Sequence, residues 1–255
     1  MKKISMLLLS LTVLVISSCS KDDDAPGGGS NGGSNAKLLK KMIKTEDGVQ
    51  TTYQFSYDSK KRATSVISTN GKESTKFTYD GDNLVKVEEM DEEFVNVYTY
   101  AYANGKPVSG TFKSWQHHAG EPDELIEDDV LTYTVQNGVV TRIHLNMTQS
   151  ELEADFDLTY TNGNLTRVAT AGDNFYTATF TFGNKKPVFP VISPFILDHA
   201  GFSLQFAAKN ELLSAHYDFT GTEMDRTITN QYTYDDKGYV LTSNDGSAQL
   251  KFQYE

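Results

Sequence analysis

The sequence lacks several features that define whole classes of protein. It has one cysteine, Cys19, so no disulfide can form within the chain. Apolar stripes with the helical period do not extend beyond about two turns, which argues against a helical fold. Lys and Arg total 23 against 34 Asp and Glu, for a formal net charge of −11. Nucleic acids need a basic stripe and anionic lipids repel an acidic surface, so neither is an expected partner of the folded part.

Catalytic signatures are also missing. The chain contains no Gly-x-Ser-x-Gly, no phosphate-binding loop and no zinc-protease helix. Asp and Glu are so numerous that a pair for glycoside hydrolysis can be chosen freely, and such a choice carries no information. EF-hand spacing does not occur, and "EEMDEE" at 88–93 is interpreted as a solubilising hairpin tip. The sequence therefore predicts no catalytic residue, no metal ligand and no cofactor.

The N-terminus, in contrast, carries a processing signal. Lys2 and Lys3 precede an apolar stretch, Met6–Ile16, that is too short to span a bilayer comfortably. The stretch closes on "ISSC", which resembles the lipobox of bacterial lipoproteins, where cleavage leaves Cys19 to carry acyl chains. Two or more such chains hold a protein stably at a membrane. The alternative is an ordinary secretory signal peptide in which Cys19 occurs by chance.

The residues after Cys19 resemble a surface-export signal. "SKDDD" at 20–24 is similar to the acidic stretch that follows the lipidated cysteine in Bacteroidetes lipoproteins destined for the cell surface; the alternative is a soluble start to a tether. "APGGGSNGGSN" at 25–35 has nothing to bury and predicts a flexible linker. We therefore expect a lipoprotein signal peptide over 1–18, the lipidated cysteine with its linker over 19–35, and one folded domain over 36–255.

One phrase recurs throughout that domain: an aromatic residue, a turn and a fresh apolar run. It reads "YDGDNLVKV" at 79–87, "VQNGVVTRI" at 135–143 and "YTNGNLTRV" at 160–168. A period of roughly 20–50 residues indicates repetition of one supersecondary unit. The first residue of the phrase, which we call the anchor, falls at Tyr57, Tyr79, Tyr102, Val135, Tyr160, Phe182, Ala208 and Tyr234.

The residues before each anchor alternate between apolar and polar, as in Tyr53-Phe55-Tyr57. Period two places the rings on one face of a strand. Turn pairs that suit two-residue hairpins follow several anchors, namely the Asn-Gly pairs at 104–105, 137–138 and 162–163. The pattern predicts about sixteen antiparallel strands in a single meander. The shared apolar face must be covered by curling the sheet into a barrel-like or strongly coiled sheet, or by folding it into a sandwich.

The segment 186–202, "KPVFPVISPFILDHAGF", interrupts the repeat. Its three prolines cannot sit inside central strands. Ser193 followed by Pro194 is typical of a helix start, and Gly201 of a helix end. We expect a loop with a short helix, "PFILDHA", near 190–201, laid against the concave apolar face. The alternative is an external loop.

The repeat resembles a known family of shells. "YQFSYDSKKRATSVISTNGKESTKFTYDGDNLVKV" at 53–87 looks like the tyrosine-aspartate (YD) repeats of Rhs and teneurin proteins, whose pattern is "YxYDxxGxL". In "FTYDGDNL", however, Phe77 replaces the first tyrosine and the glycine has moved forward to Gly81. With the lipobox and "SKDDD", the chain is more similar to an uncharacterised family of Bacteroidetes lipoproteins with a porin-like fold. This resemblance implies architecture and an outer-membrane, surface-exposed location, and it brings no catalytic residues.

The longest insertion, "SWQHHAGEPDELIEDD" at 114–129, holds the candidate ligand contacts. Trp115 is the one tryptophan of the chain and is suited to stack on a sugar or a peptide. His117 and His118 follow it, but adjacent histidines on a strand point to opposite faces, so joint metal ligation requires a loop. Trp115, His117 and His118 are therefore the candidate ligand-binding residues. The alternative is a solvated, mobile hairpin extension.

Three functions compete at this point. We favour a monomeric, non-enzymatic outer-membrane lipoprotein that presents a curled β-meander as a binding module for a glycan or protein ligand. The second function is a polysaccharide-directed hydrolase. The third is an integral porin-like barrel. Many alternating runs are shorter than the roughly 9–11 residues of a transmembrane strand, which argues against it.

Overall fold

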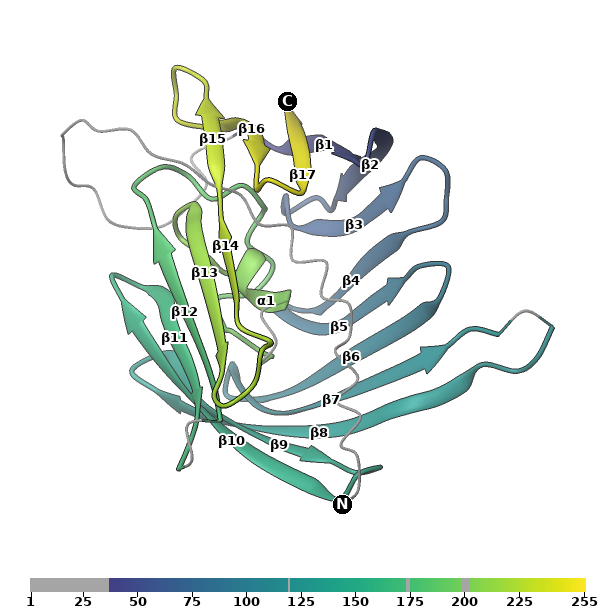
Figure 1. The fold of residues 1–255 in the computed structure, drawn as a ribbon, viewed down its shortest axis with the longest axis vertical. Coiled ribbons are helices and arrows are strands. Elements are labelled where there is room, and N and C mark those ends of the chain that lie inside the picture. Colours follow the sequence, from purple (N-terminus) through teal and green to yellow (C-terminus); the bar gives the residue numbers. More distant parts are fainter. Residues whose placement is uncertain (1–36, 119, 173–174, 199–201) are drawn as a thin grey trace.

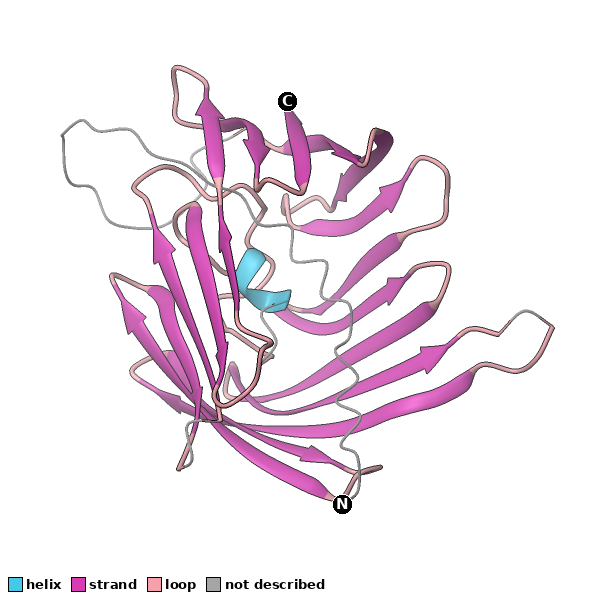
Figure 2. Cartoon of the chain, viewed as in Figure 1, coloured by secondary structure: helices cyan, strands magenta, loops and turns pink. Residues whose placement is uncertain are grey.

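The computed structural model describes residues 37–118, 120–172, 175–198 and 202–255, which form one all-β domain (Figure 1). It contains 17 strands and a helix of four residues (Figure 2). The strands are β1 (Leu39–Glu46), β2 (Val49–Tyr57), β3 (Ala63–Ser68), β4 (Ser74–Asp80), β5 (Asn83–Met90), β6 (Phe94–Ala103), β7 (Lys106–Gln116), β8 (Glu124–Gln136), β9 (Val139–Met147), β10 (Leu152–Thr161), β11 (Asn164–Thr170), β12 (Tyr176–Phe182), β13 (Leu212–Phe219), β14 (Arg226–Thr229), β15 (Gln231–Tyr234), β16 (Val240–Asn244) and β17 (Ala248–Tyr254). The helix is α1 (Phe202–Gln205), and no helix in the described part of the chain has the length and apolar character needed to cross a membrane.

The strands form one antiparallel meander that curls into a nearly closed barrel. Each strand from β1 to β13 pairs with the next along the chain, and so do β15 and β16. The last strand returns to the first, with Leu39 opposite Tyr254 and Glu46 opposite Ala248. The predicted fold class, an all-β meander curled into a barrel-like sheet, is confirmed, and the sandwich alternative is not adopted.

The closed series of paired strands is interrupted once, at Asn230, and we call this interruption the step. This residue separates β14, which pairs with β13, from β15, which pairs with β16. Residues 226–234 are therefore one run of chain whose two halves pair with neighbours on opposite sides. If that run is counted as a single strand, the 17 strands become the predicted sixteen.

The recurring phrase builds one end of the barrel. The asparagines of the three Asn-Gly turns have positive φ, 52° at Asn104, 50° at Asn137 and 52° at Asn162, and the glycines after them do too, as a type I′ turn requires. The pairing register shifts by one residue at each anchor that lies in a hairpin, for instance between Ser56 and Tyr57. In one longer turn the aspartate of the YD pair holds the loop, because Asp58 accepts hydrogen bonds from the backbone N–H groups of Lys60 and Arg62. Ala208 is the exception among the anchors, since no strand contains it.

The alternating aromatic residues face the inside of the barrel. On β2, Tyr53 and Phe55 are buried while Gln54 and Ser56 are exposed. Other strands contribute further buried side chains to the same interior, including Phe77, Val87, Tyr98, Phe112, Leu131, Ile143, Phe156, Phe180, Tyr217 and Phe252. Each such side chain stabilises the fold by about 1.5–3 kcal/mol relative to exposure to water.

The interruption of the repeat fills the inside of the barrel. We call its described residues, 187–198 and 202–208, the plug. Phe189 packs against Phe55 and Phe252 with ring centroids 6.3 Å and 6.2 Å apart. Phe206 packs against Phe77 at 5.3 Å. Most apolar side chains of the plug are buried, namely Val188, Phe189, Ile192, Phe195, Ile196, Leu197, Leu204 and Phe206. The predicted placement against the concave apolar face is therefore confirmed, and the external loop is not.

The helix of the plug lies later than the sequence predicts. Residues 194–198 of the predicted "PFILDHA" helix are irregular, and α1 begins only at Phe202. The predicted helix end, Gly201, lies outside the described residues, as does His199. Helix prediction therefore fails over the part that can be compared.

Side chains explain why this segment is not helical. The Oγ of Ser193 accepts a hydrogen bond from the backbone N–H of Phe195 at 3.0 Å, which closes a turn that no helix follows. The N–H of Leu197 donates to the Oγ of Ser203 at 3.0 Å. The carbonyl of Leu197 accepts a hydrogen bond from the hydroxyl of Tyr133 on β8, at 2.7 Å. Backbone groups satisfied in this way have no need of a helical ladder.

Candidate functional site

The two ends of the barrel carry different turns. One end, which we call the tyrosine rim, has the turns at 58–62, 81–82, 104–105, 137–138, 162–163 and 235–239. The other end, which we call the acidic rim, has the turns at 47–48, 69–73, 91–93, 117–123, 148–151, 171–175, 220–225 and 245–247. Lys72 is the one lysine or arginine in the sequence of the acidic-rim turns, whereas each of the eight turns contains an Asp or a Glu. At the tyrosine rim, Lys and Arg balance the acids.

Hydrogen bonds tie the hairpins of the tyrosine rim to one another. The hydroxyl of Tyr57 donates to the carbonyl of Leu39 at 2.6 Å, and that of Tyr79 donates to the carbonyl of Ala63 at 2.9 Å. The guanidinium of Arg62 lies 4.0 Å from the centre of the Tyr79 ring. The backbone N–H of Lys37, the first described residue, donates to the hydroxyl of Tyr239. Both ends of the described chain therefore lie at this rim.

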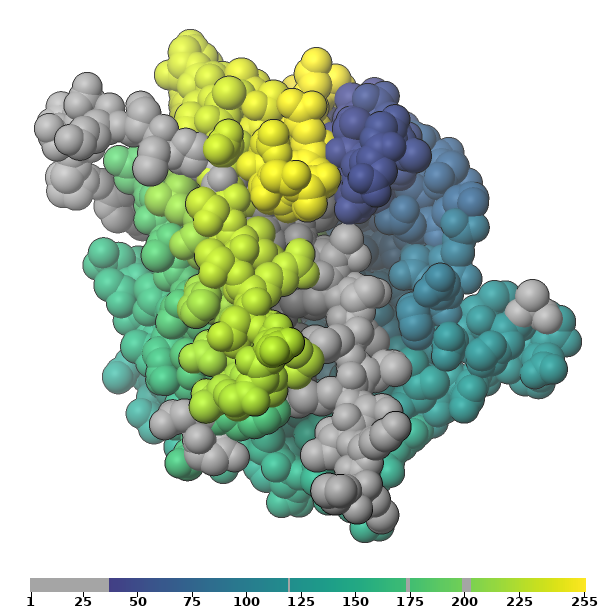
Figure 3. Space-filling view, viewed as in Figure 1, coloured from purple at the N-terminus to yellow at the C-terminus, as the bar shows by residue number. Residues whose placement is uncertain are grey.

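The predicted ligand-binding residues lie at the acidic rim, in the β7–β8 hairpin, which projects from the body of the barrel (Figure 1, Figure 3). The Nδ1 of His117 lies 2.8 Å from a carboxylate oxygen of Asp123. The Nε2 of His118 lies 3.2 Å from one of Glu124. Each histidine thus has its own carboxylate, and the two do not converge on a common point. In the part of the chain that the structure describes, no three His, Cys, Asp or Glu side chains are grouped to hold a metal ion.

Trp115 belongs to a row of apolar side chains on the outside of the sheet. It lies opposite Val95 on β6 and Leu125 on β8, and Val95 lies opposite Met90 on β5. Met90 is 46% exposed and Leu125 36%. We call Met90, Val95, Trp115 and Leu125 the outer apolar row. Its outward orientation follows from the neighbouring Ser114, which is fully buried on the inner face.

The inner face of the same four strands is polar at this level. Glu89 on β5 lies opposite Asn96 on β6, Asn96 opposite Ser114 on β7, and Ser114 opposite Glu127 on β8. The hydroxyl of Ser114 donates to the side-chain oxygen of Asn96 at 2.7 Å. We call Glu89, Asn96, Ser114 and Glu127 the inner polar row. At the acidic rim, therefore, the apolar-in, polar-out pattern of the barrel is reversed.

A third carboxyl group lies beside this row. Asp129 follows Glu127 by two residues on β8, so it points to the same inner face, and it is only 1% exposed. It lies opposite Phe112, whose ring stacks on that of Tyr98 at 4.6 Å. No N–H or hydroxyl of a described residue donates to either oxygen of Asp129. The polar group beside it is the carboxyl of Glu127.

The plug contributes a fourth carboxyl group, Asp198. It is 4% exposed, and one of its oxygens accepts a hydrogen bond from the backbone N–H of Ser203 at 2.6 Å. Its negative charge acts on Glu89 and on the hydroxyls of Tyr98 and Tyr133, so it faces the inner polar row from inside the barrel.

The environment raises the pKa values of these carboxyl groups. Burial, followed by the charge of Asp198, raises the pKa of Glu89 to about 7, although a hydrogen bond with Tyr98 acts in the opposite direction. Burial also raises the pKa values of Glu127 and Asp129, and for Asp129 the charge of Glu127 adds to the effect. The carboxyl groups are therefore harder to ionise here than in water, and a positive charge placed beside them would offset part of that cost.

Sequence analysis missed the inner polar row. The interpretation of 88–93 as a solubilising tip holds for Asp91, Glu92 and Glu93, which are exposed, and is wrong for Glu89. The alternation of inward and outward side chains could have revealed it, because Glu89 follows the buried Val87 by two residues and therefore points to the same face. Glu127 and Asp129 likewise precede the buried Leu131 with period two. The predicted lipidation site, Cys19, and the linker lie outside the described residues.

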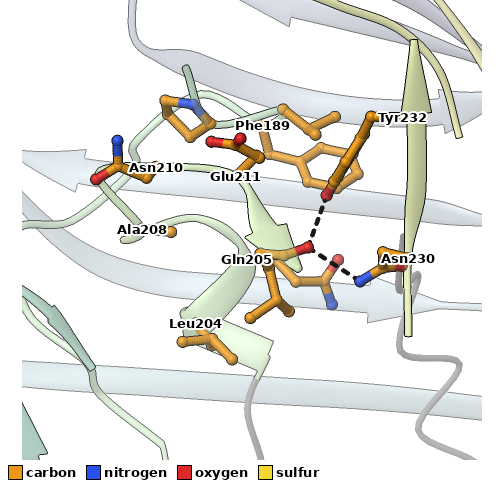
Figure 4. A pocket seen from close by; sticks show the side chains of 11 residues that line it. Phe189, Leu204, Gln205, Ala208, Asn210, Glu211, Asn230 and Tyr232 are labelled. Atoms are coloured by element: carbon orange, nitrogen blue, oxygen red, sulfur yellow. Dashed lines mark hydrogen bonds between the residues drawn. The ribbon is translucent and has the colours of Figure 1, made fainter. Parts of the chain in front are cut away.

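A small cavity lies elsewhere, between the plug and the step at Asn230 (Figure 4). The side-chain amide of Asn230 and the hydroxyl of Tyr232 both donate to the carbonyl of Leu212, at 3.1 Å and 3.0 Å. The side-chain oxygen of the buried Asn230 accepts no hydrogen bond from the described residues. The cavity volume of about 30 Å³ suits ordered water and is far below the roughly 300–1,000 Å³ of a ligand pocket.

Glu211, at the edge of this cavity, has a structural role. It is 3% exposed, and burial raises its pKa. Its carboxylate accepts hydrogen bonds from the backbone N–H of Lys185 at 2.6 Å and from the hydroxyl of Tyr234 at 3.3 Å. A Cβ at Gly183 would lie 2.1 Å from one of its oxygens, so a larger residue there would displace this carboxylate. These contacts fix the point where the chain leaves β12 for the plug.

Comparisons with known proteins identify the class of fold. No family model and no curated protein matches the sequence. A crystal structure of a porin-like protein from Bacteroides vulgatus ATCC 8482 aligns with a TM-score of 0.55 and 14% identity, over 86% of this chain and 99% of that chain. One of a porin-like protein from Bacteroides uniformis ATCC 8492 aligns with a TM-score of 0.46 and 17% identity, over 85% of this chain and 98% of that chain. The first alignment gives this chain a porin-like fold, as the resemblance implied.

Proposed function

We propose that this protein is a lipid-anchored, non-enzymatic binding module of the outer membrane, displayed at the cell surface, with its ligand engaged at the acidic rim. The lipobox, the acidic "SKDDD" and the Gly-rich linker support the anchor. The position of the first described residues supports the orientation. Because the chain enters the barrel at Leu39 on the tyrosine rim, the tether attaches there and the acidic rim is the end remote from the attachment point.

The single observation that carries the proposal is the distribution of polarity. A membrane barrel exposes apolar side chains to lipid and keeps polar ones in its lumen. Here the outer face carries rows such as Lys76, Glu88, Val97, Lys113 and Asp128, in which four of the five side chains are charged. Ion pairs join Lys113 to Asp128 and Lys86 to Glu88. The inside is apolar and holds the plug. These features favour a barrel that stands in water as a scaffold over one that conducts solutes through lipid.

The hydrolase alternative gains no support from the buried acids. Retaining glycosidases hold their two carboxyl groups about 5–5.5 Å apart, on either side of the bond to be cleaved. Glu127 and Asp129 instead lie side by side on the inner face of one strand, where the charge of Glu127 acts on Asp129.

Substitution of the anchor tests the proposal. A Cys19→Ala chain expressed in a Bacteroidetes host is expected to leave the membrane fraction without detergent, while the unaltered chain stays in it. Intact cells carrying the unaltered chain should bind an antibody against the β7–β8 hairpin. A Cys19→Ala chain that needs detergent for extraction and makes liposomes permeable to sugars would instead establish an integral pore. Cleavage of glycans or peptides by the purified protein would contradict the non-enzymatic role.

A further inference from the structure

The inner polar row places negative charge along a line on the inside of the acidic rim. Glu89 and Glu127 stand at its two ends, separated by three steps of the sheet, or about 14 Å between backbones. Asn96 and Ser114 lie between them, and Asp129 stands beside Glu127. Both end residues are half-buried, so they keep contact with solvent although they point into the barrel.

These acids have no positive partner of their own. Among the described residues, neither Glu89 nor Glu127 nor Asp129 forms an ion pair with a lysine, arginine or histidine, although the acids on the outer face of the same strands do. Asp129 is the most informative of the three, because a carboxyl group that is 1% exposed and accepts no hydrogen bond lacks the compensation that buried polar groups normally have. A cation brought by a ligand would supply it.

The arrangement suits an organic cation better than a metal ion. Calcium needs six to eight oxygens about 2.3–2.6 Å from a single point. The carboxyl groups here are spread along a row, and no three of them in the described chain are grouped for a metal. Tyr98 and Phe112 lie on the two strands between Glu89 and Glu127, one level deeper in the barrel, and aromatic faces stabilise alkylammonium groups.

We propose that the inner polar row, together with Asp129, binds a linear polyamine, with one ammonium group at Glu89 and another at Glu127 and Asp129. The inference rests on the proposed function, because it names the ligand class of that binding module. The intervening methylene groups would lie over Asn96 and Ser114, and the ammonium groups would donate hydrogen bonds to the carboxylates.

Calorimetric titration of the purified full chain with spermidine tests this directly. We expect one saturable site, weakened roughly tenfold or more in each of Glu89→Gln, Glu127→Gln and Asp129→Asn, because each change removes one charge-assisted contact. The matched controls are Glu88→Gln and Asp128→Asn, which neutralise adjacent acids on the outer face of the same strands. They should leave the affinity unchanged within about twofold. Unfolding curves of all five variants separate loss of binding from loss of fold.

Three outcomes would overturn the inference. Spermidine that does not bind, or that binds equally well to the inner-face variants, removes the site. If butylamine, which has one amine, binds as tightly as spermidine, the ligand does not span the row. If calcium chloride displaces spermidine at micromolar concentration, the site is a metal site. If Cys19→Ala behaves as proposed and spermidine fails, only the ligand class is wrong. If Cys19→Ala remains integral and spermidine still binds, only the proposed function is wrong.

Discussion

At the tyrosine rim, Tyr57 and Tyr79 donate hydrogen bonds to backbone carbonyls of neighbouring hairpins, and Arg62 covers one of the rings. At the acidic rim, Glu127 and Asp129 lie side by side on β8 without a basic partner among the described residues. The difference shows that one repeat satisfies its polar groups at one end and leaves buried acids without a basic partner at the other, where we propose that a ligand binds.

The rims also differ in how freely their turns vary. Two-residue Asn-Gly turns with positive φ recur at the tyrosine rim, and the register shift before them recurs too. The turns of the acidic rim range from the two residues at 47–48 to the seven at 117–123. Fixed turns hold the barrel closed, and variable turns are where binding residues usually lie. Five substitutions test this division of roles, taken from the largest expected effect to the smallest.

Truncation of an anchor ring should have the largest effect. Tyr79→Ala removes a ring packed against the core, its hydrogen bond to the carbonyl of Ala63 and its contact with Arg62. We expect a loss of about 3–4 kcal/mol in the free energy of unfolding, measured by urea denaturation. Tyr79→Phe serves as the control and should lose only about 1 kcal/mol. A loss below 1 kcal/mol for Tyr79→Ala would deny the tyrosine rim its structural role.

The two rims should respond to pH in opposite directions. The pKa of Glu89 is raised from 4.5 to about 7 in the folded chain, so the folded state binds its proton more tightly and stability falls as pH rises across that interval. The groups that face Glu89 are Asp198, Asp91 and Tyr98. Glu89→Gln should remove this fall and raise the free energy of unfolding at pH 8 by up to about 3 kcal/mol.

Asp235 gives the opposite sign at the tyrosine rim. Its hydrogen bond with Lys37 lowers its pKa from 3.8 to about 2, so it contributes stability that is present above pH 4 and is lost as pH falls toward 2. Asp235→Asn should flatten the curve of unfolding free energy against pH only in that acid range. Profiles of the two variants that change in the same interval would contradict the assignment of opposite electrostatic roles.

A substitution in a tight turn should have an intermediate effect on the free energy of unfolding. Gly105 has φ of 72°, and a Cβ there would meet no atom within 4 Å, so the cost of Gly105→Ala comes from the backbone alone. We expect about 1–2 kcal/mol of destabilisation in the same denaturation assay. Lys106→Ala, one residue along in the same hairpin, should change stability by less than about 0.5 kcal/mol. Equal effects of the two substitutions would show that the turn geometry is not limiting.

The smallest effect on stability is expected at the outer apolar row. Trp115→Ala removes a half-buried ring that faces solvent, and we expect a loss of no more than about 1 kcal/mol by thermal unfolding. Spermidine affinity should not change, because Trp115 and the inner polar row lie on opposite faces of the sheet. A large loss of stability would place Trp115 in the folding core and blur the difference between the rims.

The architecture could be predicted because its signals are local. The Asn-Gly turn at 162–163 and the alternation in Tyr53-Phe55-Tyr57 each depend on neighbours in sequence, and together they define hairpins, their facing and their number. The step at Asn230 and the irregular plug before Phe202 could not be predicted in the same way. Both depend on partners distant in sequence, such as Leu213 for the N–H of Asn230 and Tyr133 for the carbonyl of Leu197.

The candidate site was predictable only in part. The projecting hairpin with Trp115, His117 and His118 was found from its length and composition, and its role in binding stays a prediction. Glu89 was missed because a run of acids at a hairpin end is usually solvated. The acidic composition of the run was given more weight than the alternation that places Glu89 on the inner face. Asp198 reaches the same region only through the path of the plug, which no local pattern encodes.

The pairing of β1 with β17 has a consequence for how the chain is made. The first strand emerges with one edge bonded to β2, and its other edge stays open until the last residues arrive to lie against it. Until then the sheet presents an unpaired strand edge to any neighbouring chain, a state that invites misassembly. Chains shortened before Ala248 should therefore aggregate or be degraded, because β1 then keeps an open edge.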